Sequence, residues 1–241
     1  MSAKKILFFD TETNGLFHCS VLSFSAYVVR MDPETLDCEI QEKINRFYFP
    51  REKWDFGAAK VHGLTRDVVT EKRRGVSYPE YFAGDPFIRE TIEGCDFFIA
   101  HNIAFDESFL PLPLRQETKF DTMDYCASIL AVPSSKGKRA FKPPKLKECA
   151  AFFKIPLDED SLHESIYDVE MMFLVFMSLL QDPVYREDIR NWLTGARYRD
   201  YLKVPYAEKE EAKALGARWD AEKKKWYAPY AKDRHKFEKW R

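Results

Sequence analysis

Apolar and polar residues follow one another along this chain in a pattern that predicts strands first and then alternating strands and helices. A continuous apolar run at residues 6–9 is typical of a strand buried on both faces. Stretches rich in β-branched and aromatic residues at 21–30 and 43–49 predict two further strands. The apolar residues 97–100 predict a fourth. This order indicates a mixed-sheet α/β domain.

Helical spacing of apolar residues fills most of the remaining chain. Helices are expected at residues 54–63, 65–71, 78–93, 104–110, 121–131, 146–153, 164–180 and 186–193. Thr65 is the expected N-cap of the second of these helices, and Gly84 and Pro86 predict a break in the third. The helix at 164–180 is apolar nearly all round, which predicts that it is buried.

Charge divides the chain into two unlike parts. The whole chain holds 38 Lys and Arg against 39 Asp and Glu, a formal net charge of −1, which excludes a simple polycationic coat protein for nucleic acid. Residues 198–241 hold 13 Lys and Arg against 8 Asp and Glu, which leaves 25 against 31 for residues 1–197. We therefore expect a main domain at 1–182, a linker helix at 183–197 and a small basic α+β domain at 198–241.

The small domain has expected elements of its own. They are a strand at 202–204, a helix at 207–215 followed by Gly216, and a hairpin at 218–227. The hairpin brings Trp219 and Trp226 together, and we expect both rings in the core because so short a module has little else to bury. Its lysines at 223–225, with Arg218, form either a solvated turn or, beside exposed aromatic rings, a platform for nucleic acid.

A second basic segment, residues 133–147, holds six Lys and Arg, no acid and three Pro. It is either a solvated loop or an arm that contacts phosphates beside an active site. The two alternatives differ in what the segment lies against, so the sequence leaves both open.

Cysteine use and the first residues bear on the compartment. The five cysteines are scattered, with no CxxC pair and no zinc-ligand spacing, which is typical of a reducing compartment. Only four apolar residues, 6–9, follow the two N-terminal lysines, so no signal peptide is expected. The longest apolar stretch, 171–180, is too short to span a bilayer. We expect a cytoplasmic protein without membrane contact.

The strongest candidate chemistry lies at the end of the first predicted strand. Asp10 and Glu12 are separated by one residue, so their carboxylates project to the same side of the chain. The repulsion between them turns into attraction when a divalent cation binds. Gly15 allows a sharp turn and a close approach of substrate. Such a pair by itself is also typical of solvated loop acids.

Three more polar residues stand beside predicted elements. Asp106 comes after the strand at 97–100, and Asp168 begins the most apolar helix, with His163 five residues before it. Each has a simpler alternative. The two aspartates are acids in the first turn of a helix, where the helix dipole favours them, and His163 is a surface histidine.

Together these residues resemble the DEDDh exonucleases, the superfamily of proofreading 3′–5′ exonucleases that includes the polymerase III epsilon subunit. The segment FDTETNGL at 9–16 is similar to the first family motif, HNIAFD at 101–106 to the second, and the spacing from His163 to Asp168 to the third. VHGLT at 61–65 and Asp121-Thr122 are secondary matches. The resemblance covers residues 4–180 and implies a ribonuclease H-like mixed sheet flanked by helices.

The resemblance also implies a mechanism, two-metal phosphodiester hydrolysis with Mg²⁺ or Mn²⁺ and two ions in each site. It implies that Asp10 bridges both ions, that Glu12 and Asp168 complete one ion site and that Asp106 supports the other. It makes His163 the general base. Substrate contacts are expected from Thr11, Thr13, Gly15, Leu16, His62, Asn102 and Phe105. Leu16 is expected to wedge against the terminal base, with core packing as the alternative for Leu16 and Phe105.

The favoured function is a 3′–5′ exonuclease that acts on single-stranded or frayed nucleic acid 3′ ends, DNA in preference, in proofreading or repair. A polymerase or another protein of DNA metabolism is a candidate partner. One alternative is an exoribonuclease similar to RNase T or oligoribonuclease. Two others are a non-catalytic adaptor for nucleic acid or a polymerase, and a structural or toxin–antitoxin-like interaction protein, although these two leave the full set of acids unexplained.

The segment at 202–229 resembles a small domain of unknown function found in bacterial, phage and plasmid proteins, often appended to enzymes of DNA metabolism. The residues that carry this resemblance are VPY at 204–206, LGARWD at 215–220 and KKWYAP at 224–229. The resemblance implies no particular activity for the segment.

Overall fold

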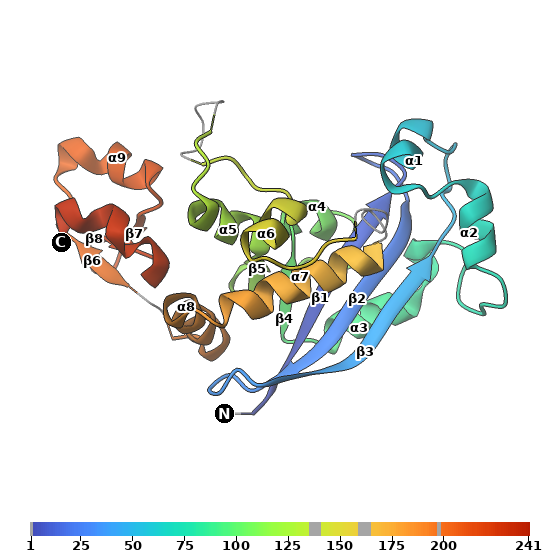
Figure 1. Ribbon diagram of the computed structural model, residues 1–241, viewed down its shortest axis with the longest axis horizontal. Coiled ribbons are helices and arrows are strands. Elements are labelled where there is room, and N and C mark those ends of the chain that lie inside the picture. The colour runs from blue at the N-terminus through green and yellow to red at the C-terminus, as the bar shows by residue number, and fades with distance from the viewer. Residues whose placement is uncertain (1, 135–140, 159–164, 197–198) are drawn as a thin grey trace.

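A computed structural model describes residues 2–134, 141–158, 165–196 and 199–241 of the chain. Its main part is a five-stranded mixed sheet (Figure 1). The strands are β1 (Lys4–Thr13), β2 (Val21–Met31), β3 (Cys38–Phe47), β4 (Phe97–Ala100) and β5 (Lys119–Asp121), in the order β3-β2-β1-β4-β5. Strand β2 is antiparallel to both of its neighbours, whereas β1, β4 and β5 run parallel. The expected mixed-sheet α/β fold is confirmed.

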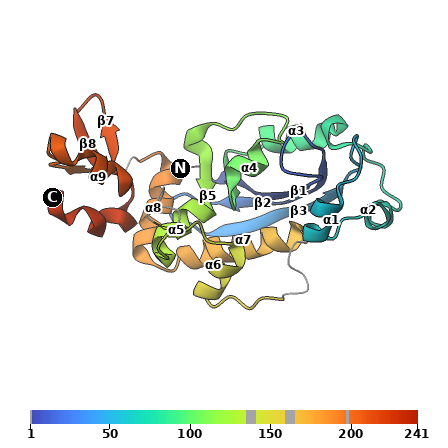
Figure 2. The same cartoon turned by 90° about the horizontal axis from the view of Figure 1, so that it is seen from above.

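Helices cover both faces of this sheet (Figure 2). The helices of the main part are α1 (Phe56–His62), α2 (Arg66–Lys72), α3 (Pro86–Glu93), α4 (Ile103–Glu107), α5 (Thr122–Leu130), α6 (Leu146–Phe152), α7 (Ser165–Leu179) and α8 (Pro183–Thr194). Helix α7 lies under β1 and β2, where Phe8 meets Phe173 and Phe176 with ring centroids 5.3 and 5.2 Å apart. Helices α3 and α4 lie on the opposite face. Among the described residues, no helix combines the length and apolar character needed to cross a bilayer.

The structure differs from the expected elements at several places. The helix expected at 78–93 is wrong in its first half, because α3 begins only at Pro86 and a single 3-10 turn, η1 (Phe82–Gly84), precedes it. Asp85 caps α3 by accepting a bond of 3.1 Å from the Phe87 amide, and Pro86 fits only the first helical turn. Strand β3 begins five residues earlier than expected. Strand β5 was not expected, since three residues are too few for a periodic pattern.

Helix α8 packs onto the main sheet domain. Its Ile189 and Leu193 are buried in the same core as the five strands. Trp192 lies edge-on against Phe97, with ring centroids 4.7 Å apart. Gly195 ends the helix with a φ of 69°, a left-handed conformation that glycine adopts without strain.

The last described segment folds into a small domain. Strands β6 (Asp200–Leu202), β7 (Arg218–Asp220) and β8 (Lys225–Ala228) form a sheet in the order β6-β8-β7, with η4 (Tyr206–Glu208), α9 (Lys209–Ala214) and η5 (Ala231–Trp240) around it. The expected hairpin is confirmed, and Trp219 faces Trp226 across it. The core placement is wrong for Trp219, whose side chain is 50% exposed, because the other aromatic residues Phe237 and Trp240 of η5 fill the core instead.

Candidate active site

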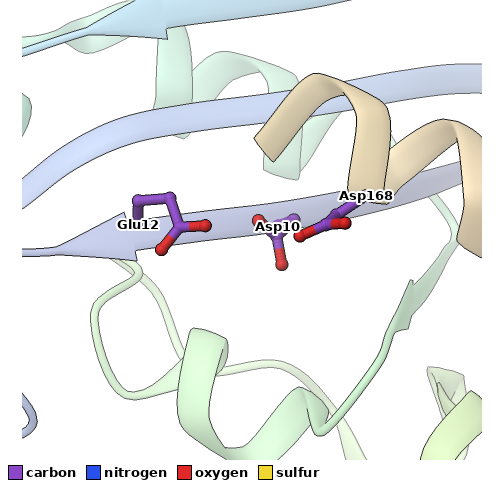
Figure 3. Close-up of side chains that lie close together, drawn as sticks. All are labelled: Asp10, Glu12 and Asp168. Carbon is purple, nitrogen blue, oxygen red and sulfur yellow. The ribbon is translucent and has the colours of Figure 1, made fainter. Parts of the chain in front are cut away.

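Three carboxylates from two distant parts of the chain meet at one end of the sheet (Figure 3). Asp10 and Glu12 lie on β1, and Asp168 lies in the first turn of α7. One oxygen from each of the three carboxylates lies within 4.8 Å of the others. We call Asp10, Glu12 and Asp168 the carboxylate cluster.

A fourth carboxylate, Asp106 of α4, adjoins the cluster and is only 3% exposed. Its Oδ1 accepts two hydrogen bonds from Thr11, one from the amide at 2.9 Å and one from the hydroxyl at 2.7 Å. Because Thr11 stands between Asp10 and Glu12 on β1, these bonds hold α4 against the strand that carries the cluster. The four acids expected from the sequence are therefore brought together.

Burial and mutual repulsion disfavour the charged forms of these acids. Burial, followed by repulsion from Asp106, Glu12 and Asp168, raises the pKa of Asp10 well above its ordinary value. Burial, followed by repulsion from Asp168 and Asp106, raises the pKa of Glu12 to about 8. Burial raises the pKa of Asp106 to about 7, although the two bonds from Thr11 act in the opposite direction.

The donor set fits a hard divalent cation. Asp10 Oδ2 is buried and accepts no hydrogen bond from any described residue, which is costly for a carboxylate oxygen unless another positive group satisfies it. Carboxylate oxygens are the ligands that Mg²⁺ and Mn²⁺ prefer. Asp10, Glu12 and Asp168 are the residues that can hold such an ion, with Asp106 beside them.

Three serines set the position of α7 against the sheet. The hydroxyl of Ser165, the first residue of α7, lies 2.6 Å from that of Ser25 and 3.0 Å from that of Ser23, and all three are buried. On β2, Ser25 pairs with Asp10 and Ser23 with Glu12. The serine contacts therefore place the start of α7, and with it Asp168, beside the two acids of β1. Sequence reasoning missed these serines, since small hydroxyl residues in strands and helices carry no pattern of their own.

Asp121 plays the matching part for α4. Its carboxylate accepts bonds of 3.1 Å from the amides of Asn102 and Ile103 at the start of α4. It also caps α5 through the amide of Met123 at 2.9 Å. One side chain thus fixes the ends of two helices, and Asp106 lies one turn further along α4. The sequence marked Asp121 only through the family resemblance.

The residues expected to touch substrate differ in how accessible they are. Thr11 and Thr13 are buried, and the Thr13 hydroxyl donates to the Gly15 carbonyl at 2.5 Å. Gly15 has a φ of 155°, which residues with side chains rarely adopt. Leu16 is 69% exposed, so the alternative of core packing is wrong for it.

His62 is buried at the end of α1 and ties that helix to β1. Its Nδ1 accepts from the Leu64 amide at 3.0 Å, which leaves Nε2 to donate to the Thr13 carbonyl at 3.2 Å. Asn102 is exposed at the start of α4 with a φ of 78°. Phe105 is half-buried and packs edge-on against Phe109, with ring centroids 5.2 Å apart. Their contacts with substrate stay predictions.

His163, the expected general base, lies outside the described residues, as do residues 135–140 of the basic segment. At the flanks of that segment, Pro133 pairs with Phe141. His101 Nε2 lies 3.0 Å from the carbonyl oxygen of Pro144. Neither the role of His163 nor a contact of the basic segment with phosphate is tested by the structure.

Comparison with known proteins gives a family match and similar solved structures for the main domain. Residues 7–176 match the model of the family described as Exonuclease. Exonuclease X, solved with 5′ overhanging duplex DNA, is 16% identical with a TM-score of 0.51, and the match covers 78% of this chain and 98% of that one. The nuclease domain of 3′hExo, a DEDDh family member solved with rAMP, is 14% identical with a TM-score of 0.53 over 75% and 94% of the two chains. Exonuclease I of Escherichia coli, solved with a dA16 oligonucleotide, is 16% identical with a TM-score of 0.55 over 81% and 44%. These three structures share the expected fold with this chain.

The small domain has relatives of a different kind. Residues 199–241 match the model of a domain of unknown function, DUF5710. A stretch of 42 residues is 55% identical to the DNA primase TraC of Escherichia coli, which is 17% of this chain and 3% of the primase. The chain therefore spans only a small part of this curated relative.

Proposed function

This chain belongs to the exonuclease family, and from that premise we propose that it is a metal-dependent 3′–5′ exonuclease acting on single-stranded or frayed nucleic acid, DNA in preference. The observation that carries the proposal is the carboxylate cluster of Asp10, Glu12 and Asp168, with one buried Asp10 oxygen that no described residue satisfies. A non-catalytic adaptor would have no use for so costly an arrangement.

Each acid has a part in this proposal. Asp10, Glu12 and Asp168 hold the cations, and Asp106, oriented by Thr11, supports the second ion position. When bound, two Mg²⁺ or Mn²⁺ ions supply positive charge for the attacking and leaving oxygens of the phosphodiester. His163 takes the proton of the attacking water, a role for which an ordinary imidazole pKa near 6.5 is suited.

The relatives support a nucleic-acid substrate without choosing its sugar. Exonuclease X and exonuclease I were solved with DNA, whereas the 3′hExo nuclease domain was solved with rAMP. We favour DNA because the small domain is similar to part of a DNA primase.

The test is hydrolysis by the purified full chain of strands labelled at the 5′ end, with Mg²⁺, with Mn²⁺ and with EDTA. A 3′–5′ exonuclease gives a ladder of progressively shorter labelled products, whereas a strand labelled at its 3′ end releases mononucleotide at once. Matched DNA and RNA strands in the same assay decide whether the protein is an exonuclease that prefers DNA or an exoribonuclease.

The control pair separates this activity from a contaminating nuclease. Asp10→Asn removes one cluster charge and is expected to abolish hydrolysis, whereas Asp67→Asn changes an exposed acid of α2 and is expected to leave the rate unchanged. Wild-type protein that leaves both strands intact with either ion overturns the proposal. His163→Ala is expected to slow hydrolysis by about 10²–10⁴-fold, and a rate near the wild-type value removes the base from the scheme.

A further inference from the structure

The positive charge of the small domain is distributed unevenly. Six of its cations form ion pairs with its own carboxylates: Arg199, Lys232, Arg234, Lys236, Lys239 and Arg241. On the β7–β8 hairpin (residues 218–228), by contrast, Arg218 and the lysines 223–225 are exposed. None of these four lies within 4.0 Å of a carboxylate of the described residues. Lys203, Lys209 and Lys213 of the small domain also form no ion pair with a described carboxylate, so the hairpin carries four of the seven such cations of residues 199–241.

The same hairpin exposes an aromatic ring. Trp219 is 50% exposed on β7, which is one of the two edge strands of the small sheet. Its ring lies 5.5 Å from that of Trp226, at an interplanar angle of 62°, and Trp226 packs against the small core. Trp226 thus supports the Trp219 ring from behind and leaves its outer part accessible.

Both features meet at one rim of the sheet. Strand alternation directs Trp219 and Trp226 to the face that bears the core, and Arg218, Tyr227 and Lys225 to the other face. Because β8 is the one neighbour of β7 among the described strands, the two faces of the sheet join at the other edge of β7. A strand of nucleic acid along this edge can stack a base on the indole and place phosphates on the cations.

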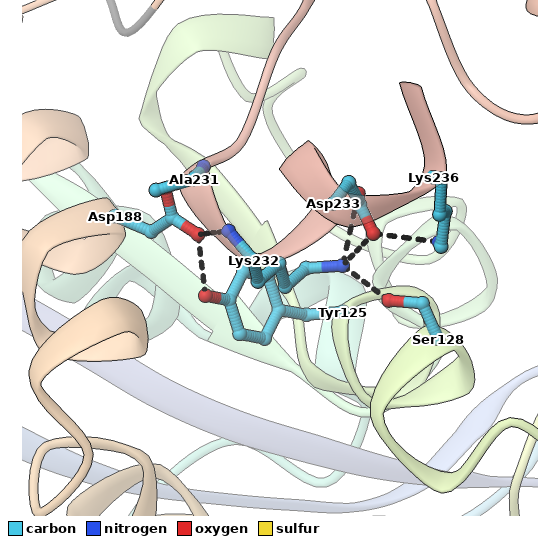
Figure 4. Close-up of polar contacts among 7 residues, drawn as sticks. All are labelled: Tyr125, Ser128, Asp188, Ala231, Lys232, Asp233 and Lys236. Carbon is cyan, nitrogen blue, oxygen red and sulfur yellow. Dashed lines mark hydrogen bonds and ion pairs between the residues drawn. The ribbon is translucent and has the colours of Figure 1, made fainter. Parts of the chain in front are cut away.

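The hairpin is held in a defined position relative to the candidate active site (Figure 4). Buried Asp188 of α8 accepts from the hydroxyl of Tyr125 at 2.9 Å and from the amides of Ala231 and Lys232 at 2.7 and 3.2 Å. The Lys232 ammonium donates to Ser128 of α5 and to Asp233. These bonds, which we call the docking network, join the small domain to α5 and α8.

A cleft of about 660 Å³ is lined by residues of the small domain and of α4, α5 and α8. Ile103 and Ala104 of α4 line one wall, and Ala217 and Arg218 line the other. Figure 2 shows the hairpin on the same side of the main sheet as α4. Asp106 also lies on α4, although neither Asp106 nor a residue of the carboxylate cluster lines the cleft.

We propose that the β7–β8 hairpin is a second binding site, which holds single-stranded nucleic acid by stacking on Trp219 and by phosphate contacts to Arg218 and the lysines 223–225. Exposed cations alone would fit an acidic peptide equally well, but the supported, exposed indole beside them fits a base. Residues 1–197 carry 25 Lys and Arg against 31 Asp and Glu, so the main domain repels a polyanion overall. The hairpin adds exposed positive charge to a chain whose larger part is net acidic.

The test is equilibrium binding of fluorescein-labelled dT20 and rU20 to the full chain in EDTA, read by fluorescence anisotropy over a range of salt. Without divalent ions, binding is measured separately from the proposed hydrolysis. Trp219→Ala is expected to weaken binding about 5- to 100-fold, the loss of one stacked base. Replacing the lysines at 223–225 by Gln is expected to lower the slope of log Kd against log salt by about 2, at about 0.7 for each phosphate contact on a single strand.

The matched control is Lys239→Gln, which removes another exposed cation of the small domain, one that already pairs with Glu208 and Glu211. It is expected to change the Kd less than twofold. The lysines lie in and beside the turn of the hairpin, outside the core, so the triple variant tests binding even if Trp219→Ala perturbs the fold. Similar effects on dT20 and rU20 indicate that stacking and phosphates suffice, and a hairpin effect on one of them alone assigns the site to that nucleic acid.

Two results overturn the proposal. One is wild-type affinity and salt slope in both hairpin variants. The other is binding of polyglutamate, but of neither oligonucleotide, through the hairpin, which assigns the surface to an acidic protein. Failure of the nuclease proposal is distinguishable, because it leaves hairpin-dependent binding intact in EDTA while no strand is shortened in Mg²⁺.

Discussion

Removing one charge from the carboxylate cluster is expected to stabilise the metal-free protein. Glu12→Gln keeps the size of the side chain but carries no charge at any pH. The pKa of Glu12 is about 8 instead of 4.5 because burial and the neighbouring acids disfavour its charged form. One pH unit corresponds to about 1.4 kcal/mol, so ionised Glu12 costs at most about 5 kcal/mol of folding free energy.

The realised gain is smaller than this bound. The neighbouring carboxylates share the burial and repulsion, and they redistribute protons when one charge is removed. We expect about 2 kcal/mol at pH 8.5, which for a chain of this size raises the Tm by about 4–8 °C.

The sign with pH follows from the raised pKa. Folded Glu12 binds its proton more tightly than unfolded Glu12, so this group favours folding fully below the unfolded pKa of 4.5, and the benefit is lost as pH rises towards about 8. The advantage of Glu12→Gln is therefore expected at pH 8.5 and largely absent at pH 4.5–5.

The assay is thermal unfolding in EDTA at pH 5 and pH 8.5, followed by circular dichroism. The control is Glu148→Gln on α6, an acid whose pKa the hydrogen bond from Lys142 lowers, so the variant should be neutral or slightly destabilised. A Tm of Glu12→Gln at or below the wild-type value at pH 8.5 would refute the account of the cluster as a costly set of charges that a cation compensates.

Three further predictions follow from the same contacts. Mg²⁺ is expected to bind more tightly at pH 8.5 than at pH 6 and to release protons, because it displaces them from acids with raised pKa values. Calorimetry in buffers of different ionisation enthalpy measures this proton release. A binding heat that does not depend on the buffer contradicts the prediction. Thr11→Val removes the hydrogen bond from the Thr11 hydroxyl to Asp106. It is expected to lower the free energy of unfolding, measured with denaturant, by about 1–2 kcal/mol at pH 8.5 and by less at pH 5, where Asp106 is protonated. Equal losses at the two pH values argue against a bond to the carboxylate. Asp188→Asn leaves one acceptor oxygen for three donors and is expected to speed amide hydrogen exchange in η5. The control is Glu187→Gln, which changes an exposed residue of α8 and is expected to leave exchange unchanged. Unchanged exchange in Asp188→Asn means that the docking network does not hold the small domain.

Local pattern was sufficient for much of the fold. The apolar residues of β4 predicted its bounds as observed, and Thr65 was confirmed as the cap that accepts from the Val68 amide at 3.3 Å. These features depend on residues close in sequence, which is why periodicity and capping chemistry predict them. Strand β5 was missed because it is a strand only through its pairing with β4.

The candidate active site, like the fold, was predicted in part by local sequence pattern. The sequence marked Asp10 and Glu12 as a pair on one strand, and the resemblance added Asp106 and Asp168. The contacts of Ser165 with Ser23 and Ser25 had no signal, because 140 or more residues separate the partners along the chain. The sequence pattern also did not predict that Trp219 is exposed, because its exposure depends on which other aromatic side chains fill the core of the small domain.

The sequence by itself determined which acids the chain offers, the order of its main strands and helices, and the contrast between an acidic domain and a basic one. Only the tertiary structure decided that Asp10, Glu12 and Asp168 lie close enough to share a cation, that burial raises the pKa values of Asp10 and Glu12, and that four cations of one hairpin form no ion pair with a described carboxylate. The physical reason is that backbone and side-chain preferences act between near neighbours along the chain. Desolvation and Coulomb forces instead depend on distances in space, which the packing of remote elements sets.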